Sequence, residues 1–503
     1  MNDTNTQPGK DNPELDKLRE QCGVFAIMCD DPCMNVAQFI YTGLMALQHR
    51  GQEAAGIVVM RPGRSIYRYR DVGLVNDVLS PEKITGLGGN IALGHVRYGT
   101  VSSSTDVACA QPWFFQSNEI NFAIVFNGTI TNYTPLRKRL EENGHVFTTS
   151  VDTEVISHLI ADIHKKRDDW VEIINILMKT LDGSYAIIIM TEAGDLFGFR
   201  DPRGYKPLCY GEFTAGNGHE TRLQILASET CAIDALSGKV TGHVKPGEIV
   251  HLHMNEPLCS ESTINCDRHA LCQFEFIYFA NNTSELDGIS VYETRKKLGA
   301  NLFKIAPVMS ENAIVVPVPD SGRSAALGYA QASGLPFEEA LIKNRYITRT
   351  FIMPGQDKRR SLVNLKLFPD KKTLEGRDVI LIDDSIVRGT TTEKIVRLLK
   401  NNGARSVHLR ISCPPIKYPC FMGIDFPTRN ELIASKHSVD EICRILGADS
   451  LAYQTIDGLV DSIGLGKNDL CMACIDKNYP LTIQPSLEFL EETFTKNRQA
   501  RER

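Results

Sequence analysis

A cysteine near the start of the chain has the surroundings of a nucleophile. Cys22 precedes the apolar run GVFAIM, which is typical of a buried strand, and it follows a polar leader of 21 residues. If the leader is removed, Cys22 gains a free α-amine, which titrates at roughly pH 8 and can accept the proton of its own thiol. The stretch alone favours a structural cysteine in a buried strand over a nucleophile.

Four later stretches of the sequence support a catalytic role for this cysteine. The stretches LQHRGQEAAG, GHVRYGT, FNGTI and SVDTE, together with CGVF, resemble class II glutamine amidotransferases of the N-terminal nucleophile hydrolase superfamily. The resemblance implies that Cys22 attacks the glutamine side-chain amide, and that Arg97 and Asp152 hold the α-carboxylate and the α-ammonium of glutamine. An arginine fork suits a carboxylate and an aspartate suits an ammonium. The resemblance also implies that Asn127 and the N–H of Gly128 stabilise the oxyanion.

A second motif, DVILIDDSIVRGTT, runs a buried strand into two carboxylates and then into the start of a helix. Adjacent carboxylates suit a ribose diol or Mg²⁺, and a helix N-terminus suits a phosphate. The whole pattern resembles the phosphoribosylpyrophosphate (PRPP) signature of type I phosphoribosyltransferases, and PVPDSGRSAA resembles their pyrophosphate loop. This resemblance implies Mg²⁺ ligands at Ser321, Asp383 and Asp384. It implies PRPP binding by the following residues of the two motifs: Asp320, Ser321, Gly322, Asp383, Asp384, Ser385, Val387, Arg388, Gly389, Thr390 and Thr391.

Between these motifs lies a long basic stretch without clear periodicity, from Lys343 to Leu367. Long loops without periodicity inside a compact domain are usually functional or disordered. The resemblance implies a catalytic flap over PRPP in which Arg349 and Lys366 meet phosphates. A solvated charged loop is the alternative for each of these side chains.

Four cysteines form the third candidate site. Cys471 and Cys474 have the two-residue gap that lets two thiolates reach one metal centre. With Cys272 and Cys420 they resemble the ligands of the cluster-containing branch of glutamine PRPP amidotransferases, which implies a structural [4Fe-4S] cluster. Zn²⁺ suits four thiolates equally well by ligand count alone.

Three places depart from the patterns of these families. Phe126 stands where the amidotransferases often have histidine, and Ala26 stands where they commonly have glycine. Asn281, Asn282, Thr283 and Ser284 stand where an Arg-Pro-Asp-Ser stretch is usual.

The elements that must position these residues show two different patterns of apolar residues, one in each half of the chain. Short alternating runs up to about residue 253, with helical periodicity between them, predict antiparallel sheets covered by helices. The later runs AIVVPVP and DVILID, each followed by a helical pattern, predict βαβ units with buried parallel strands. The resemblance implies a four-layer αββα sandwich of α+β class, followed by an α/β domain with helices on both faces of a parallel sheet. The predicted divisions are a leader (1–21), an amidotransferase domain (22–255), a phosphoribosyltransferase domain (256–470) and a cluster-ligand segment with a helix (471–503).

The bulk properties limit the classes of function. The chain has 503 residues, 42% of them hydrophobic and 23% charged, and its net charge of −6 gives no reason to expect nucleic acid as a partner. No apolar run is long enough for a membrane span, and the leader lacks the apolar core of a secretory signal. Fourteen cysteines are too dilute for a disulfide scaffold. We therefore expect a cytoplasmic protein whose partners are small molecules.

A glutaminase half followed by a PRPP-binding half resembles the iron–sulfur branch of the glutamine PRPP amidotransferase family. The resemblance implies a pentosyltransferase that hydrolyses glutamine at Cys22 and passes ammonia through the protein to C1 of PRPP. Displacement of pyrophosphate would give 5-phosphoribosylamine, the first committed step of purine (IMP) synthesis. It also implies a homotetramer inhibited by purine nucleotides.

Two other functions remain open at this point. One is a class II amidotransferase with another acceptor, such as a hexosamine-phosphate synthase or an asparagine synthetase. The other is a regulatory PRPP- or nucleotide-binding protein with an inactive glutaminase. The PRPP signature argues against the first, and the complete glutaminase set argues against the second.

Overall fold

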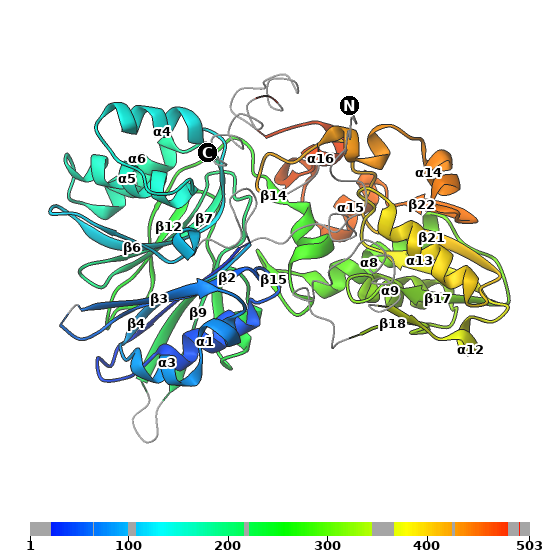
Figure 1. Cartoon of the computed structure of the whole chain (residues 1–503), viewed down its shortest axis with the longest axis horizontal. Helices are drawn as coiled ribbons and strands as arrows, with labels where there is room; N and C mark the ends of the chain where they lie inside the picture. The colour runs from blue at the N-terminus through cyan, green and yellow to red at the C-terminus, as the bar shows by residue number, and fades with distance from the viewer. Residues whose placement is uncertain are drawn as a thin grey trace, which may run out of the picture.

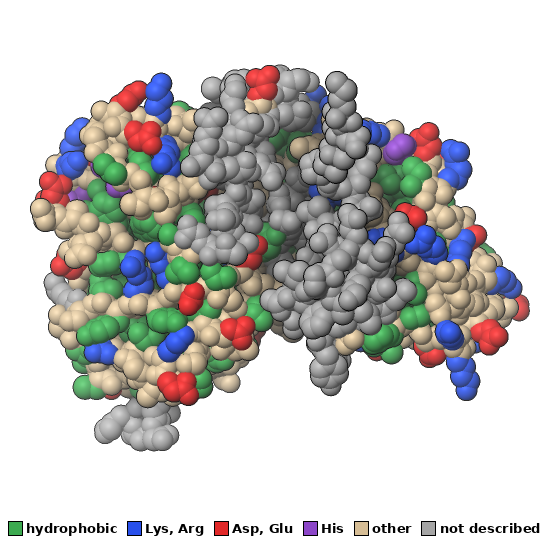
Figure 2. Space-filling view, viewed as in Figure 1, with side chains coloured by type: hydrophobic (Ala, Val, Ile, Leu, Met, Phe, Trp, Pro, Cys, Tyr) green, Lys and Arg blue, Asp and Glu red, His purple; other side chains and the backbone are tan. Residues whose placement is uncertain are grey.

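The computed structural model describes residues 22–63, 65–98, 107–215, 221–344, 367–424, 428–480 and 492. In this part of the chain no helix is long and apolar enough to cross a membrane. Figure 1 shows two halves side by side, the first built on two stacked sheets and the second on one sheet. Positive and negative side chains are interspersed over the described surface of both halves in the view of Figure 2.

The first half contains a seven-stranded antiparallel sheet with β1 near its middle. Its strands in spatial order are β11 (Lys239–His243), β9 (Cys209–Ala215), β10 (Thr221–Ala227), β1 (Gly23–Cys29), β4 (Ile91–Arg97), β2 (Ala54–Met60) and β3 (Ile66–Val72). The helices associated with this sheet are α1 (Ala37–Ala46), α2 (Val75–Val78), α3 (Pro81–Gly86) and α7 (Cys231–Asp234).

A second antiparallel sheet, of six strands, packs against the first. Its strands in spatial order are β13 (Cys259–Thr263), β12 (Glu248–Leu252), β8 (Leu196–Arg200), β7 (Gly183–Thr191), β6 (Asn121–Ile130) and β5 (Trp113–Gln116). The helices that cover its outer face are α4 (Tyr133–Glu142), α5 (Asp152–His164) and α6 (Trp170–Thr180). Strand β13 pairs with β12 of this sheet, although it lies beyond residue 255, the predicted end of the first domain.

The apolar pattern of β1 explains the order of the layers. Phe25 and Ile27 pack with the helices over the first sheet, whereas Val24, Ala26 and Met28 pack against the second sheet. Alternate side chains of a strand point to opposite faces, and both faces of β1 are covered. The strand therefore reads as a continuous apolar run, and the predicted αββα sandwich is confirmed.

The second half is built on a four-stranded parallel sheet in the order β17 (Ala313–Pro317), β20 (Asp378–Asp383), β21 (Ser406–Ile411) and β22 (Ser450–Tyr453). Its helices are α8 (Val291–Ile305), α9 (Arg323–Ser333), α12 (Lys371–Leu374), α13 (Thr390–Asn401), α14 (Val439–Leu446), α15 (Ile456–Ile463) and α16 (Ala473–Asp476). Helix α9 packs on one face of the sheet and α13 on the other. The predicted α/β class of this half is confirmed.

Short pairings complete the second half. They are β14 (Leu271–Cys272) with β23 (Leu470–Cys471), β15 (Glu285–Leu286) with β16 (Ile289–Ser290), and β18 (Leu341–Lys343) with β19 (Leu367–Pro369). A π-helical turn, η3 (Glu275–Phe279), follows β14.

Candidate functional site

The predicted glutaminase residues gather where three strands meet. β1 and β4 are antiparallel neighbours, with Gly23 opposite Val96, so Cys22 lies beside Arg97 at the end of β4. Both strands pack against β6, which carries Asn127 and Gly128.

Asp152 reaches the same end of β6 from the start of α5. Its Oδ2 accepts a hydrogen bond from the N–H of Ile130 at 3.4 Å. Asp152 and Arg97 are both buried, with exposed fractions of 9% and 6%. Two opposite charges are thereby held in the interior of this half.

The environment of Cys22 shifts its acidity in two directions. The Sγ atom lies 3.6 Å from the carbonyl oxygen of Tyr98. Burial raises the pKa of the Cys22 thiol, and the nearby cations of Arg97 and Lys206 offset part of that increase. Lys206 is 1% exposed and was not predicted from the sequence, because a single lysine in a loop carries no recognisable pattern.

Asn127 and Gly128 have the features of oxyanion donors. The Nδ2 atom of Asn127 is buried and meets no hydrogen-bond acceptor among the residues that the structure describes. Gly128 has φ +155°, and a Cβ there would lie 2.0 Å from the carbonyl oxygen of Ser184. A side chain at position 128 would therefore displace the strand.

The LQHRGQE stretch lies against β4 and against Gly23, the residue after Cys22. A Cβ on Gly51 would lie 2.6 Å from the backbone of Val96, so only glycine lets this loop approach β4. The N–H of Glu53 donates to the carbonyl of Arg97 at 3.1 Å. The loop therefore fixes the position of Arg97.

The departure at Phe126 lies on the other face of β6. The Phe126 side chain packs under the helices α4 to α6, whereas Asn127, next along the strand, points to the opposite face. The backbone of Phe126 is held by Gln111 and by His95, whose Nε2 donates to its carbonyl at 3.1 Å. The substitution therefore leaves the face that carries Asn127 unchanged.

The predicted PRPP residues lie at the carboxyl ends of β17 and β20. The hydroxyl of Ser321 donates to the Asp384 carboxylate, and Ser385 donates to its other oxygen at 2.5 Å. Asp383 accepts a hydrogen bond from the N–H of Asp384 at 2.9 Å. A Cβ on Gly322 would lie 2.3 Å from the carbonyl of Ile382, so this glycine allows the two loops to touch.

The segment after Asp384 wraps the start of α13. Gly389, with φ +86°, is the N-cap residue, and no side chain of the described residues caps this helix. Thr390 and Thr391 form its first turn, where N–H groups suit an anion. Val387 is buried in the core, so only its backbone can face a ligand, and the Arg388 guanidinium pairs with Glu431.

Two predicted loop segments flank this site. Asp320 accepts a hydrogen bond from the Nζ of Lys343 at 2.8 Å. Arg349 and Lys366, predicted as flap residues, lie outside the described residues.

The four predicted cluster cysteines converge from distant parts of the sequence. Cys272 and Cys471 are paired neighbours in the parallel strands β14 and β23. The carbonyl of Cys474 accepts hydrogen bonds from the N–H groups of Lys417 and Tyr418, which bring Cys420 to the same place. Burial raises the pKa of Cys272, and neighbouring Cys471 and Cys420 raise it further.

The cysteine region touches the glutaminase region. Ser184, next to Gly128 across the sheet, donates its hydroxyl hydrogen to the carbonyl of Met422 at 2.8 Å. A Cβ on Gly423 would lie 3.4 Å from Lys206 Nζ and 3.7 Å from the carbonyl carbon of Gly128. The loop after Cys420 therefore packs on the strand that carries the predicted oxyanion donors.

Comparison with known proteins supports the predicted family of each half. A family model described as a glutamine amidotransferase domain matches residues 100–235, and one described as a phosphoribosyl transferase domain matches residues 298–418. The fold and these matches define a glutamine amidotransferase joined to a phosphoribosyltransferase.

Relatives that match almost the full length of the chain identify one family within this class of proteins. The chain is 43% identical over 475 residues to an amidophosphoribosyltransferase of Methanothermobacter thermautotrophicus, covering 94% of this chain and 98% of that protein. A solved structure of the B. subtilis glutamine PRPP amidotransferase, complexed with ADP and GMP, is similar at 41% identity and a TM-score of 0.82. This similarity covers 92% of this chain and 98% of the B. subtilis chain. A structure described as the allosteric regulatory enzyme of purine biosynthesis is also similar, with 41% identity and a TM-score of 0.83.

The chain therefore belongs to the amidophosphoribosyltransferase family, and it is an enzyme of the pentosyltransferase class.

Proposed function

We propose that Cys22 is the nucleophile that hydrolyses glutamine, with Arg97 and Asp152 binding its α-carboxylate and α-ammonium. The observation that carries this proposal is the buried Nδ2 of Asn127, which has no acceptor among the described residues beside the predicted nucleophile. A buried donor without a partner costs about 1 to 3 kcal/mol, which is offset if an oxyanion accepts from it. The N–H of Gly128 is the second donor.

The ammonia then displaces pyrophosphate from C1 of PRPP at the end of β20. The paired carboxylates Asp383 and Asp384 with the Ser321 hydroxyl supply only oxygen donors, which Mg²⁺ prefers. Bound there, Mg²⁺ would neutralise charge on the departing pyrophosphate. The start of α13 binds the ribose 5-phosphate through its N–H groups.

The four cysteines hold a [4Fe-4S] cluster with a structural role. Within the described residues, no three of the sulfurs of Cys272, Cys420, Cys471 and Cys474 lie within 4.8 Å of one another. A tetrahedral Zn²⁺ with Zn–S bonds of about 2.3 Å needs sulfurs roughly 3.8 Å apart. The wider spacing supports a cluster with several metal atoms rather than one zinc ion.

Other features of the family are extended to the chain as part of this proposal. Purine nucleotides act as feedback inhibitors, which the complex of the similar B. subtilis enzyme with ADP and GMP supports. The homotetramer is extended from the family resemblance alone. Residues 1–21 are a propeptide that is cut before Cys22. The enzyme works in the cytoplasm, since none of its fourteen cysteines, all within the described residues, forms a disulfide.

The experiment that tests the function measures glutamate and pyrophosphate together, in protein incubated with glutamine, PRPP and Mg²⁺. Both products should form in equal amounts. Cys22→Ala should abolish glutamate formation but keep pyrophosphate release from free ammonium, because the second site uses separate residues. Asp383→Asn with Asp384→Asn should have the opposite effect, and Asp461→Asn, at an exposed carboxylate, should change neither activity.

Two results would contradict the proposal. Glutamate formation without any PRPP turnover would favour an amidotransferase with another acceptor. Binding of PRPP without either product would favour a regulatory protein.

A further inference from the structure

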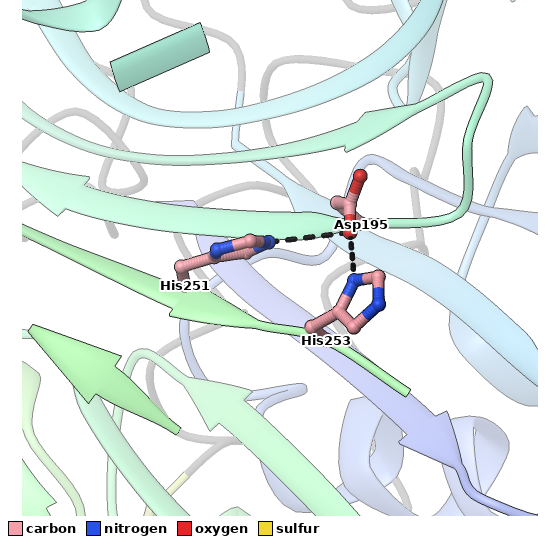
Figure 3. A group of neighbouring side chains, drawn as sticks. All are labelled: Asp195, His251 and His253. Atoms are coloured by element: carbon pink, nitrogen blue, oxygen red, sulfur yellow. Dashed lines mark hydrogen bonds and ion pairs between the residues drawn. The ribbon is translucent and has the colours of Figure 1, made fainter. Parts of the chain in front are cut away.

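A group of metal-binding side chains lies far along the first half's second sheet, on strands that carry none of the residues assigned above. Asp195 stands at the start of β8, and His251 and His253 lie in and just after β12. Figure 3 shows both imidazole rings directed toward the Asp195 carboxylate. None of the three was singled out from the sequence, because the HLH stretch follows the alternation of an ordinary strand.

The strand register brings these residues together. Leu252 pairs with Leu196, so His253 is placed opposite Asp195 one position further along. His251 and His253 are two residues apart and point to the same face of the sheet. Three side chains with metal-binding atoms therefore share one face because β8 and β12, which are not consecutive in the chain, are paired in the sheet.

The distances approach those of a metal site. His251 Nε2 lies 3.2 Å from Asp195 Oδ1, and His253 Nδ1 lies 2.5 Å from the same oxygen. A tetrahedral Zn²⁺ with bonds of about 2.05 Å places its ligand atoms roughly 3.3 Å apart. The pair with His251 already has this spacing. The His253 ring must move outward by about 0.8 Å, which its 51% exposed side chain permits.

The ring of His251 is held on its other sides. Its Nδ1 lies 3.1 Å from Glu261 Oε1 on β13, and Phe197 stacks on the ring at a centroid distance of 4.2 Å and an angle of 14°. A carboxylate on the far nitrogen of a ligating histidine fixes its tautomer and leaves the other nitrogen as the metal ligand. Glu261 has this position relative to Asp195 and His253.

We propose that Asp195, His251 and His253 bind one Zn²⁺ ion, with water as the fourth ligand and Glu261 orienting His251. Two imidazoles and one carboxylate suit Zn²⁺ better than Mg²⁺ or Ca²⁺, which prefer oxygen ligands. The ion would join the turn before β8 to the end of β12 and so stabilise this edge of the second sheet. It is distinct from the magnesium and cysteine sites.

The test titrates the chelator-treated holoenzyme with Zn²⁺, measures bound zinc and iron after dialysis, and records the thermal unfolding midpoint. A Cys33→Ser background removes one exposed thiol. One Zn²⁺ per chain should bind and raise the midpoint. Asp195→Asn and His253→Gln should each weaken binding at least ~10-fold, and Glu261→Gln should weaken it about 10-fold through His251. The exposed His437→Gln is the matched control and should bind as the parent does.

His253→Gln keeps the proposal testable if Asp195→Asn fails to fold, because His253 is half exposed. Equal zinc affinity in the parent and His253→Gln would overturn the site. Loss of zinc binding in Cys259→Ser with unchanged binding in His253→Gln would also overturn it, since the ion would then sit at the neighbouring group formed by His251, Cys259 and Glu261.

Discussion

At the scale of single residues, the interior of the first half holds polar side chains of two kinds: those that we propose act on the substrate, and those that hydrogen-bond to its own backbone. Asn127 is the clearest case of the first kind, because its amide N–H₂ is buried without an acceptor in the described part of the protein. His95 is a case of the second kind, because its ring is buried against the carbonyl of Phe126.

We predict that Asn127→Ala lowers the kcat of glutamine hydrolysis by about 100- to 1000-fold, with a much smaller change in KM. The donor acts on charge that develops only in the transition state, so its loss affects kcat first. Steady-state kinetics of glutamate release measure both constants. Asn121→Ala, further along the same strand, is the control, and an increase in KM with unchanged kcat would contradict the oxyanion role.

His95 yields a prediction about pH. Burial lowers the pKa of His95 from 6.5 to about 3, and the Arg97 cation acts in the same direction. Between these values the unfolded chain binds a proton here that the folded chain does not bind, so this contribution to stability is complete above pH 6.5 and is lost as the pH falls toward 3.

His95→Gln should therefore reduce the pH dependence of stability by up to ~1.4 kcal/mol per pH unit between pH 6 and pH 4. Thermal midpoints of the variant, the parent and the exposed His437→Gln control, recorded across this range, measure the slope. Parallel slopes in His95→Gln and the parent would show that His95 does not titrate in this way.

At the scale of elements, the close packing of α8 and α9 bears on the loop that we propose binds pyrophosphate. Helix α9 begins directly after Gly322 and packs against α8, where a Cβ on Gly299 would lie 1.8 Å from the carbonyl of Ala325. The two helices approach so closely only because Gly299 and Gly328 lack side chains.

We predict that Gly299→Ala destabilises the second half by about 1 to 3 kcal/mol and raises the KM for PRPP, because α9 must move and carry the loop with it. Gly86→Ala is the matched control, since nothing lies within 4 Å of a Cβ there. Urea unfolding and PRPP kinetics give the two readouts. A fall in stability with an unchanged KM would mean that α9 does not position the loop.

The elements also show what the sequence could and could not predict. Strands such as β1 and β20 were predicted because their faces are both covered, which makes them apolar throughout. Strand β3 was not, because it is an edge strand with the sequence IYRYRDV and exposed side chains. The register that places Asp195 beside His251 and His253 depends on the pairing of β8 with β12, two strands that are distant in the chain, and composition does not encode this pairing.

At the scale of the whole molecule, buried charges join the two halves. The Cβ of Arg50 lies beside Gly23, the residue after Cys22. The Arg50 guanidinium pairs with Glu229 and with Glu275 of η3, the latter at 2.6 Å. Burial opposes the charged form of Glu229, but Arg50 and His49 outweigh it and hold the pKa of Glu229 below its usual range.

The departure after IYFA contributes to this junction. The N–H of Asn281 and the hydroxyl of Ser284 both donate to Glu229, at 2.8 Å and 2.6 Å. Arg295 donates to Asn282 at 2.7 Å, and the charge of Asp384 acts on it. The sequence marked this stretch as different, but only the fold shows that it links the predicted glutamine and PRPP regions.

The four cysteines form the second connection, and their loss should affect both halves. We predict that Cys420→Ser removes most of the iron, lowers the thermal midpoint by at least ~5 °C and lowers glutaminase kcat. The midpoint should fall because ligands from distant segments close long loops, and glutaminase kcat should fall because the loop after Cys420 packs on Gly128.

Anaerobically purified parent should be brown with about four iron atoms per chain. The control variant Cys33→Ser, at an exposed cysteine, should match the parent in colour and iron content. Colourless, zinc-loaded parent of full activity would refute the iron cluster, and unchanged glutaminase in iron-free Cys420→Ser would refute the coupling through this loop.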